Sequence, residues 1–328
     1  MKHLFIINPM AWQARSRMTE IFQRIHGLFK EHPAFEYDIH ITRWRRDAVG
    51  FIHRYAAGAK DIVRVYAVGG TGTFFEVING VVGLPNIQVA LWPCGKDNSF
   101  LRYFGDDRLR LFSALENLVF AGVTGVDVFR CNGNYGLTYG SVGLESRADN
   151  LGGRLSKKTG FPADICYISA AVWDLFRRGT GQWYNLDLDG MRLDGAYISM
   201  LVANGPCYGT GFSPAVDAHP NDGKLEVYTT RPAVTREYPR LMADYTSGQY
   251  ANWPEYVSHY SGRCLRVSSD EVMSISLDGE LFYEKSVTFE LIPYAVDLVC
   301  PLGVDMAKLP RIFGRGQAAP PEEVRAHE

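Results

Sequence analysis

Four short apolar runs separated by helix-like segments dominate the first part of this 328-residue chain. The runs are HLFIIN (3–8), FEYDIHIT (35–42), VRVYAVGG (63–70) and IQVALWP (87–93). From Met18 to Phe29 apolar residues recur at three- and four-residue spacing, which predicts an amphipathic helix over about 17–30. A second helix is predicted around 48–56. Alternation of strand and helix is typical of a parallel sheet covered by helices, so we expect an α/β domain first.

The pattern changes at about residue 125. Short alternating runs broken by Gly, Asn and Asp at hairpin-like intervals then predict an antiparallel β-rich domain, with helices near 161–178 and 234–250. The length of the chain suits two domains. The expected division is 1–124 for the α/β domain and 125–300 for the β-rich domain. We expect about 301–314 to pack back on the first domain, and the Pro-, Ala- and charge-rich tail 315–328 to be mobile.

Composition narrows the class of protein. The formal net charge of −2 argues against a surface built for nucleic acid, so any basic site must be local. The six cysteines form no C-x-x-C pair, and no histidine pair has zinc-ligand spacing, which predicts free thiols in a reducing cytoplasm and no zinc site. The apolar run at the N-terminus is too short for a signal peptide, and no run approaches 18 apolar residues. We therefore expect a cytoplasmic protein that can touch a membrane from its surface.

The stretch AVGGTGTFFEVING (67–80) is the first candidate site. An apolar strand runs into Gly69-Gly70-Thr71-Gly72-Thr73 and then into a helix-like segment. This order places backbone N–H groups and a helix N-terminus at the edge of a sheet, where phosphate can bind, and glycine lets a ligand approach the main chain. The stretch is neither a G-x-G-x-x-G dinucleotide motif nor a P-loop with its lysine, so a simple tight turn remains an alternative reading.

Seven stretches together resemble one family. They are FIINPMAW (5–12), ITRWRRDA (41–48), AVGGTGTFFEVING (67–80), LWPCGKDNSFLRYFG (91–105), GSVGLESRADN (140–150), YGTGFSPAVDAHPNDGKLEV (208–227) and SLDGELF (276–282). In this order they resemble the motifs of the soluble lipid kinase family with a diacylglycerol kinase catalytic domain, which also includes sphingosine and ceramide kinases. The resemblance implies a nucleotide-binding N-terminal domain, a β-rich C-terminal domain, and an ATP cleft between them.

The resemblance also assigns site residues. It implies that ATP is cradled by Asn8, Pro9, Thr42, Gly69, Gly70, Thr71, Gly72, Thr73, Gly95, Lys96 and Asn98. Asp278 and Glu280 match a D-G-E motif whose Asp is the general base, with Mg²⁺ held by acidic residues. Phosphoryl transfer needs a group that orients the nucleophile and charge that neutralises phosphate, which suits carboxylates there. Without the resemblance, Asp278-Gly279 would read as a hairpin turn. Asp222, in an Asn-Asp-Gly turn, is a candidate metal ligand.

Five positions depart from the family pattern. They are Trp12 where Gly is usual, Thr71 for Asp, Lys96 for Thr, Ser99 for Asp and Glu145 for Asp. Thr71 matters most, because a hydroxyl brings neither the charge nor the magnesium affinity of the expected carboxylate. Lys96 could offset part of this loss by placing a cation near the phosphates. The departures suit either an altered charge balance or an inactive cleft.

Two classes of function follow. The first is an ATP- and Mg²⁺-dependent kinase of a lipid hydroxyl, diacylglycerol-like or sphingoid. The alternative is a non-catalytic member that binds a nucleotide or a lipid. A kinase of a soluble alcohol or a nicotinamide cofactor is disfavoured, and the missing G-x-S-x-G elbow argues against an α/β-hydrolase. Expected partners are a lipid substrate, a transient membrane contact and, through exposed strands, a second copy in a homodimer. The basic cluster RWRR (43–46) reads as a solvated loop, and no nucleic acid is expected.

Overall fold

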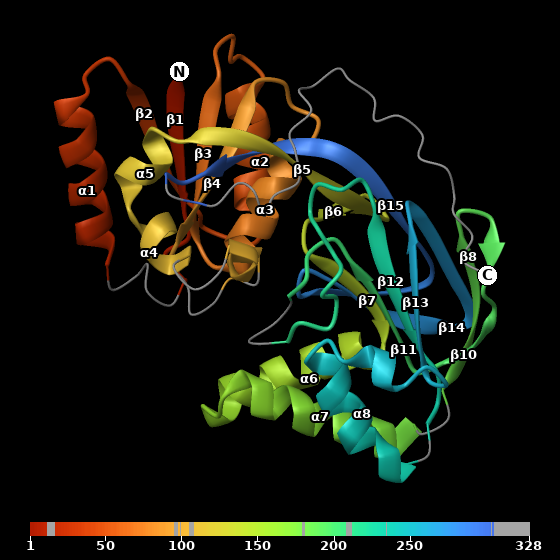
Figure 1. Ribbon diagram of the computed structural model, residues 1–328. Helices are drawn as coiled ribbons and strands as arrows, with labels where there is room; N and C mark the ends of the chain where they lie inside the picture. The colour runs from red at the N-terminus through yellow and green to blue at the C-terminus, as the bar shows by residue number, and fades with distance from the viewer. Residues whose placement is uncertain are drawn as a thin grey trace.

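The computed structural model describes residues 1–11, 17–94, 98, 100–104, 108–178, 181–207, 212–233, 235–302 and 304. Its N-terminal part is built on parallel strands in the order β4-β3-β1-β2 (Figure 1). These strands are β1 (Lys2–Ile7), β2 (Glu36–Ile41), β3 (Val63–Gly69) and β4 (Ile87–Pro93). Each lies in one of the four apolar runs, which confirms the predicted parallel sheet.

Helices cover this sheet on both sides (Figure 1). They are α1 (Met18–Glu31), α2 (Asp47–Ala56), α3 (Thr71–Val81), α4 (Arg108–Ser113) and α5 (Leu115–Val119). The predicted apolar stripe of α1 is its buried face, with Ile21, Ile25, Leu28 and Phe29 in the core. The helices predicted near 17–30 and 48–56 are therefore confirmed.

The second part of the chain is antiparallel. Its strands are β5 (Gly122–Cys131), β6 (Asn134–Gly136), β7 (Tyr139–Gly143), β8 (Gln182–Leu188), β9 (Met191–Arg192), β10 (Gly195–Tyr197), β11 (Ser199–Ala203), β12 (Leu225–Thr230), β13 (Val257–Gly262), β14 (Cys264–Leu277) and β15 (Glu280–Cys300). The path β13-β12-β11-β7-β14-β15 forms its main sheet. The predicted antiparallel β-rich half is confirmed, although β13 was not anticipated.

One long strand joins the two halves. The 21-residue β15 runs antiparallel to β14 and β5, and its register on β5 shifts between Ile292 and Val296. Beyond this shift, Asp297 and Leu298 pair in parallel with Gln88 and Val89 of β4. The C-terminal sheet is thereby hydrogen-bonded to the N-terminal sheet, and the division at residue 124 stays a prediction.

The helices α6 (Leu144–Thr159), α7 (Ala163–Arg178) and α8 (Tyr238–Thr246) pack beside the antiparallel sheet (Figure 1). The helix predicted at 161–178 is confirmed, and that predicted at 234–250 is shorter. The sequence did not reveal α6, because Gly152-Gly153 weakens a helical pattern. The structure supplies the reason for Gly152: a Cβ there would come 2.7 Å from Cα of Tyr167, so the glycine lets α6 and α7 approach closely.

Other expectations concern the ends and the surface. Leu302 N donates to Asn117 O at 3.4 Å, and Val304 packs against the N-terminal core, while the rest of 301–314 and the tail 315–328 lie outside the described residues. All six cysteines are free thiols, as predicted. No described helix has both the length and the apolar character needed to cross a bilayer.

Candidate functional site

The predicted glycine loop joins β3 to α3. β3 ends at Gly69, Gly70 is the N-cap with an extended backbone (φ −100°, ψ −164°), and α3 begins at Thr71. Among the described residues, no side chain caps this helix, and its first turn holds no acidic residue. An uncapped helix start presents backbone N–H groups and the positive end of the helix dipole. This end of the parallel sheet is therefore suited to bind an anionic group such as phosphate.

Two glycines of the loop differ in what surrounds them. A Cβ on Gly69 would lie 2.3 Å from Thr73 Oγ1 and 2.6 Å from Thr73 Cβ, so this glycine is required by internal packing. A Cβ on Gly72 would meet no atom of the described part of the chain within 4 Å, and Gly72 is exposed. The absence of a side chain at Gly72 leaves the helix start open to a ligand.

The ends of β1 and β2 meet the same loop. Asn8 Nδ2 donates to Thr73 Oγ1 at 3.1 Å, and Asn8 Oδ1 accepts from Met10 N at 2.9 Å across Pro9. Thr42, just after β2, donates its backbone N–H to Ile7 O at 2.9 Å. The predicted residues Asn8, Pro9 and Thr42 therefore come from neighbouring strand ends, with Asn8 in direct contact with the glycine loop.

The segment after β4 runs alongside. Cys94 N donates to Gly69 O at 3.0 Å. Asn98 is buried, and its Oδ1 accepts from Phe100 N at 3.1 Å, whereas its Nδ2 has no hydrogen-bond partner within the described chain. An unpaired buried donor near an open loop is consistent with a ligand contact. Gly95 and Lys96, and the departures Trp12 and Ser99, lie outside the described residues.

Side chains from the two halves of the chain meet at a small cavity. Arg45 forms an ion pair with Glu280, and Arg46 donates to Asn134 Oδ1. Nearby, Asn79 Nδ2 donates to Tyr135 O at 2.8 Å. The cavity has a volume of about 190 Å³ and is lined by Arg45, Arg46, Phe75, Asn132, Asn134, Leu277, Glu280, Leu281, Phe282 and Glu284. Glu280, predicted as catalytic, thus presents its carboxylate to a space between the domains.

Asp278 is placed differently. It and Gly279 adopt left-handed backbone (φ 47° and 87°) in the turn from β14 to β15, a pattern typical of a tight hairpin. Its carboxylate accepts three backbone N–H groups, from Leu137 at 2.6 Å, Thr138 at 3.0 Å and Tyr139 at 2.9 Å. Burial raises the pKa of Asp278, and these hydrogen bonds oppose the rise. The residue holds the loop before β7, and its role as a general base stays a prediction.

The predicted metal ligand Asp222 is half-buried and lies beside the fully buried carboxylate of Asp127. Asp222 Oδ1 accepts from Lys224 N at 3.0 Å, and Asp127 accepts from Gly223 N and Tyr294 N, each at 2.8 Å. Burial raises the pKa of both carboxyls, that of Asp127 to about 6. Among the described residues no group of three His, Cys, Asp or Glu could hold a metal ion, so Asp222 as a metal ligand stays a prediction.

The described residues fit the phosphates of ATP better than they fit Mg²⁺, the second ligand that the family resemblance implies. The uncapped start of α3, the open Gly72 and the unpaired Asn98 Nδ2 fit the phosphates of a nucleotide. Mg²⁺ prefers carboxylate oxygens, and the first turn of α3 provides none because Thr71 stands at its start. The described residues therefore do not fit a magnesium site at this loop.

Some contacts of the site were not anticipated. Arg46 and Asn79 each form a hydrogen bond from the N-terminal half to the C-terminal half. Asn204 Nδ2 donates to Asp127 O at 2.9 Å and to Leu137 O at 2.7 Å. The only sequence signals were the basic cluster 43–46 and the Asn-Gly-Pro turn that follows β11. Glu145, a departure from the family pattern, is buried and accepts from Tyr245 OH at 2.7 Å.

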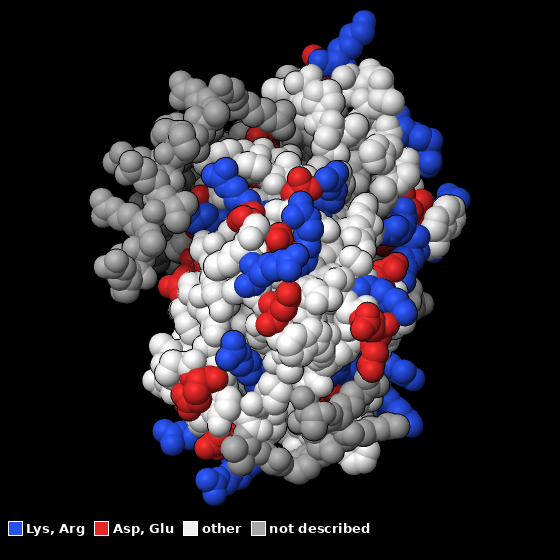
Figure 2. Space-filling view, turned by 90° about the vertical axis from the view of Figure 1, so that its right-hand side faces the viewer, with Lys and Arg blue, Asp and Glu red and all other residues white. Residues whose placement is uncertain are grey.

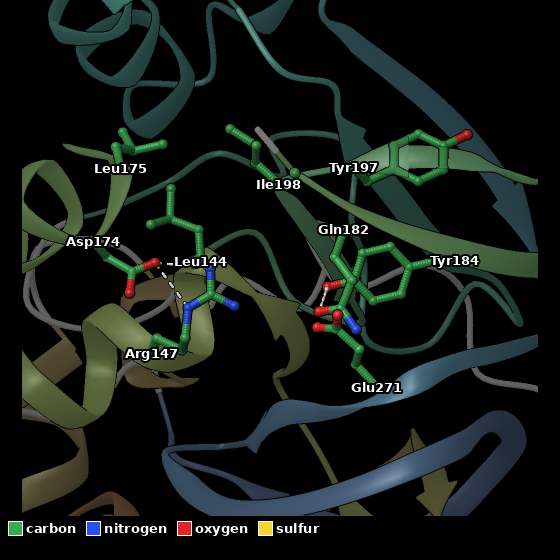
Figure 3. Close-up of a pocket in the computed structure, with 10 residues that line it drawn as sticks. Leu144, Arg147, Asp174, Leu175, Gln182, Tyr184, Tyr197, Ile198 and Glu271 are labelled. Atoms are coloured by element: carbon green, nitrogen blue, oxygen red, sulfur yellow. Dashed lines mark hydrogen bonds and ion pairs between the residues drawn. The ribbon is translucent and has the colours of Figure 1, made fainter. Parts of the chain in front are cut away.

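A second cavity lies away from the glycine loop, between the helices α6 and α7 and strands β8 and β10. Its volume is about 290 Å³. Figure 3 shows Arg147 of α6 directed at Asp174 of α7, and the pair is joined at 2.8 Å.

On the face shown in Figure 2, the described acidic and basic side chains are intermixed rather than gathered into a basic strip.

Comparisons with known proteins agree with this arrangement. The family model of the diacylglycerol kinase catalytic domain matches residues 2–131, and that of the YegS C-terminal NAD kinase beta sandwich-like domain matches residues 139–300. Relatives from Staphylococcus haemolyticus (strain JCSC1435) and Staphylococcus aureus (strain JH9), each named "Putative lipid kinase", are 28% identical over 246 residues. The alignments cover 74% of this chain and 77% and 78% of the two relatives.

A solved structure extends the comparison to the fold. A diacylglycerol kinase from Bacillus anthracis (strain Sterne) superposes with a TM-score of 0.67 at 21% identity, covering 92% of this chain and 98% of the other. At 21% identity the similarity is evidence for a shared fold alone. Because the two family models follow one another along almost the whole chain, the chain belongs to the kinase family that joins a diacylglycerol kinase catalytic domain to a YegS-type C-terminal domain.

Proposed function

We propose that this protein is an ATP-dependent lipid kinase that phosphorylates the hydroxyl group of a diacylglycerol-like or sphingoid lipid. The observation that carries the proposal is the uncapped start of α3 beside the exposed Gly72, within the matched diacylglycerol kinase catalytic domain. The relatives named as lipid kinases support a lipid as the acceptor.

The N-terminal residues would bind the nucleotide. Backbone N–H groups at Thr71, Gly72 and Thr73 would donate to phosphate oxygens, since they stand in the first turn of α3. Asn8 fixes Thr73 through its hydrogen bond, and Asn98 offers a buried N–H donor. Phosphoryl transfer depends chiefly on positioning and on neutralising charge. This set supplies positioning, together with the partial positive charge of the helix N-terminus.

The acceptor hydroxyl would lie in the cavity between the domains. Of the two predicted catalytic carboxylates, Glu280 lines that cavity, whereas Asp278 is engaged by three backbone N–H groups. We therefore assign proton acceptance to Glu280 and its positioning to Asp278. The hydroxyl oxygen forms a bond to the γ-phosphorus, the bond from that phosphorus to the bridging oxygen of ADP breaks, and the hydroxyl proton passes to Glu280.

The ion pair of Glu280 with Arg45 does not prevent this role. The Arg45 side chain is 72% exposed and that of Glu280 33%, and exposed pairs contribute little to stability. When the pair opens, the guanidinium of Arg45 becomes available to a phosphate, which it can bind through two parallel hydrogen bonds.

Transfer of labelled phosphate from ATP to lipids in mixed micelles tests the proposal. Glu280→Gln should lower the rate at least about 100-fold, because general bases contribute roughly 10²–10⁴-fold. Glu284→Gln is the matched control: it removes another carboxylate that lines the same cavity and should change the rate little. An equal rate in Glu280→Gln and wild type would refute the assignment of the base.

The second candidate is a non-catalytic protein that binds a nucleotide or a lipid. It is favoured by Thr71, which leaves the loop without the carboxylate expected of a magnesium-dependent kinase. ATP binding without turnover on any lipid of a panel containing diacylglycerols, ceramides and sphingoid bases would support this candidate over the kinase.

A further inference from the structure

The second cavity, of about 290 Å³, lies where two strands of the C-terminal sheet separate. β8 pairs with β14 from Asn185 to Leu188, whereas its first residues, Gln182–Tyr184, pair with β10. The register of β14 on β15 shifts between Ser268 and Met273, and after the shift β14 pairs with β7 on its other side. β8 and β14 therefore diverge, and we call the space between them, closed by α6 and α7, the fork cavity.

Hydrogen bonds hold the base of the fork. Ser269, buried in the irregular part of β14, donates from its Oγ to Trp183 O at 2.9 Å and accepts from Gln182 Nε2 at 2.8 Å. Gln182 Oε1 in turn accepts from Tyr184 OH at 3.2 Å. A bulge that redirects side chains is common beside binding sites. Here the irregular part of β14 includes Glu271, which lines the cavity.

Buried apolar and aromatic side chains form much of the wall. They are Leu144, Leu175, Tyr184, Tyr197 and Ile198. Sites for small molecules typically combine such a wall with a few placed polar groups, in volumes of about 300–1,000 Å³. The fork cavity lies at the lower end of this range, so it suits a compact ligand.

Arg147 supplies hydrogen-bond donors on one side of the cavity. Its Nε and Nη2 both contact Asp174 Oδ2 at 2.8 Å, and Asp174 neutralises the charge of the guanidinium. Among the described residues, Nη1 of Arg147 has no hydrogen-bond partner, and Figure 3 shows this nitrogen turned away from Asp174. The side chain of Arg147 is only 22% exposed, so a ligand in the cavity would meet a donor that is held in place. This donor is suited to an oxygen acceptor.

Glu271 supplies negative charge on the other side. Figure 3 shows its carboxylate beside Gln182, across the cavity from Arg147. The charged side chains that line the cavity are one arginine and two carboxylates, so an excess of one negative charge remains. Opposite charges attract more strongly where the protein excludes part of the water. A cation is therefore the preferred partner of Glu271, and an oxygen acceptor is the preferred partner of Arg147.

We propose that the fork cavity binds a small amino alcohol. Its ammonium group meets the carboxylate of Glu271, and its hydroxyl oxygen accepts a hydrogen bond from Nη1 of Arg147. The same two groups occur on a free amino alcohol and on the head of a sphingoid base, and competition between the two distinguishes these sources. The nucleotide loop and Glu280 belong to α3 and β15, so binding in the fork cavity does not depend on the proposed function.

Isothermal titration calorimetry of ethanolamine into the full chain, without ATP, tests the proposal. We expect saturable binding that Glu271→Gln weakens roughly tenfold or more, because the ammonium group loses its charged partner. Asp270→Asn is the matched control: Asp270 is the exposed neighbour of Glu271 and does not line the cavity, so this variant should bind as wild type does. Circular dichroism confirms that both variants are folded.

Analogues of ethanolamine test the two contacts separately. Ethylene glycol lacks the ammonium group and should not bind, whereas ethylamine lacks the hydroxyl group and should bind wild type roughly fivefold more weakly than ethanolamine. Arg147→Lys keeps a cation for Asp174, but its single nitrogen is engaged there, so ethanolamine and ethylamine should bind this variant equally. A preference for ethanolamine that is the same in Arg147→Lys and wild type would contradict the contact with Nη1.

Sphingosine, added below the concentration at which it forms micelles, distinguishes the two sources. Displacement of ethanolamine by sphingosine would assign the cavity to a lipid head, and no displacement would assign it to a free amino alcohol; both results support the proposal when Glu271→Gln weakens the binding. Two outcomes would overturn it. One is no heat of binding for ethanolamine at tens of millimolar in folded wild type, and the other is an equal loss of affinity in Glu271→Gln and Asp270→Asn.

Discussion

The loop Gly69–Thr73 and the turn Asp278–Gly279 are both short glycine-containing connections between regular elements, yet they leave their polar groups in opposite states. In the loop, none of the side chains that the structure describes caps the start of α3 or approaches the Cβ position of Gly72. In the turn, Asp278 is only 7% exposed, and its carboxylate accepts three backbone N–H groups. The loop thus leaves backbone N–H groups available to a ligand, whereas the turn uses a buried carboxylate to stabilise the fold.

This contrast distinguishes residues that are available to bind a ligand from residues that stabilise the fold. Polar groups that are already paired and buried hold the protein together, and removing one partner leaves the others unsatisfied. Polar groups that are unpaired at an open helix start are available to a ligand. Substitutions in the turn should therefore lower the free energy of unfolding, and substitutions at the open side of the loop should lower ligand affinity instead.

The largest effect is expected for Asp278→Asn. Asparagine tolerates the left-handed backbone, so the turn itself should survive. The amide cannot accept all three backbone N–H groups, which should lower the free energy of unfolding by about 2–4 kcal/mol, measured by urea denaturation. Asp189→Asn is the matched control, because Asp189-Gly190 forms a similar turn (φ 50° and 90°) that is exposed to solvent. Equal losses in the two variants would mean that burial of the Asp278 carboxylate is unimportant.

The buried carboxyl of Asp127 should affect how stability depends on pH. Burial raises its pKa from 3.8 to about 6, so the folded state keeps a proton that the unfolded state releases, and stability falls as pH rises from about 4 to about 6. Burial lowers the pKa of His3 from 6.5 to about 4, which makes stability rise over nearly the same range. The two contributions oppose each other in the wild type.

Asp127→Asn should therefore remove one contribution to the fall, so that between about pH 4 and pH 6 its free energy of unfolding rises relative to that of the wild type by roughly 3 kcal/mol. His3→Gln should change the profile in the opposite direction, because it removes the rise. Urea denaturation across this pH range gives both slopes, and parallel profiles for wild type and both variants would contradict the assignment of these groups.

A pair of glycine substitutions tests the two sides of the loop. Gly69→Ala places a methyl group 2.3 Å from Thr73 Oγ1 and should cost about 1–3 kcal/mol of stability. Gly72→Ala meets nothing within 4 Å and should be neutral or slightly stabilising, since alanine favours a helix. Thermal denaturation of the two variants measures the difference. If Gly72→Ala proves as unstable as Gly69→Ala, the space at Gly72 is not open.

The smallest effect on stability is expected for Thr71→Asp. A carboxylate at the first position of α3 should interact favourably with the helix dipole and raise the free energy of unfolding by about 0.3–1 kcal/mol. Without metal it should also weaken ATP binding through repulsion, and added Mg²⁺ should reverse that loss. ATP affinity that is indifferent to both the substitution and Mg²⁺ would place the phosphates elsewhere.

The sequence predicted the fold where a local pattern determined it. The period of the apolar residues in α1 and the four apolar runs of the parallel sheet depend on burial, which leaves a clear trace in residue order. Helix α6 was missed because Gly152 serves contact with Tyr167, a residue of another helix. The pairing of β15 with β4 could not be predicted either, because it joins Asp297 to Gln88, which are far apart in the sequence.

For the site, the sequence located the glycine loop, which is a contiguous motif. It could not separate the roles of Asp278 and Glu280, two residues apart in one motif. Their difference arises from the loop Leu137–Tyr139, which supplies the N–H groups that engage Asp278, and from Arg45, which meets Glu280 across the cavity. Such partners are distant in sequence and carry no local signal.

Titration calorimetry of ATP into wild type and Gly72→Val tests the central claim most directly. Valine at Gly72 would place two methyl groups at the start of α3, and its Cβ would meet no atom of the described residues within 4 Å. The account predicts that wild type binds ATP and that Gly72→Val loses at least about tenfold in affinity, or roughly 1.4 kcal/mol, while remaining folded. Equal ATP affinity in the two proteins, or no binding by folded wild type at millimolar ATP, would contradict the assignment of this loop as the nucleotide site.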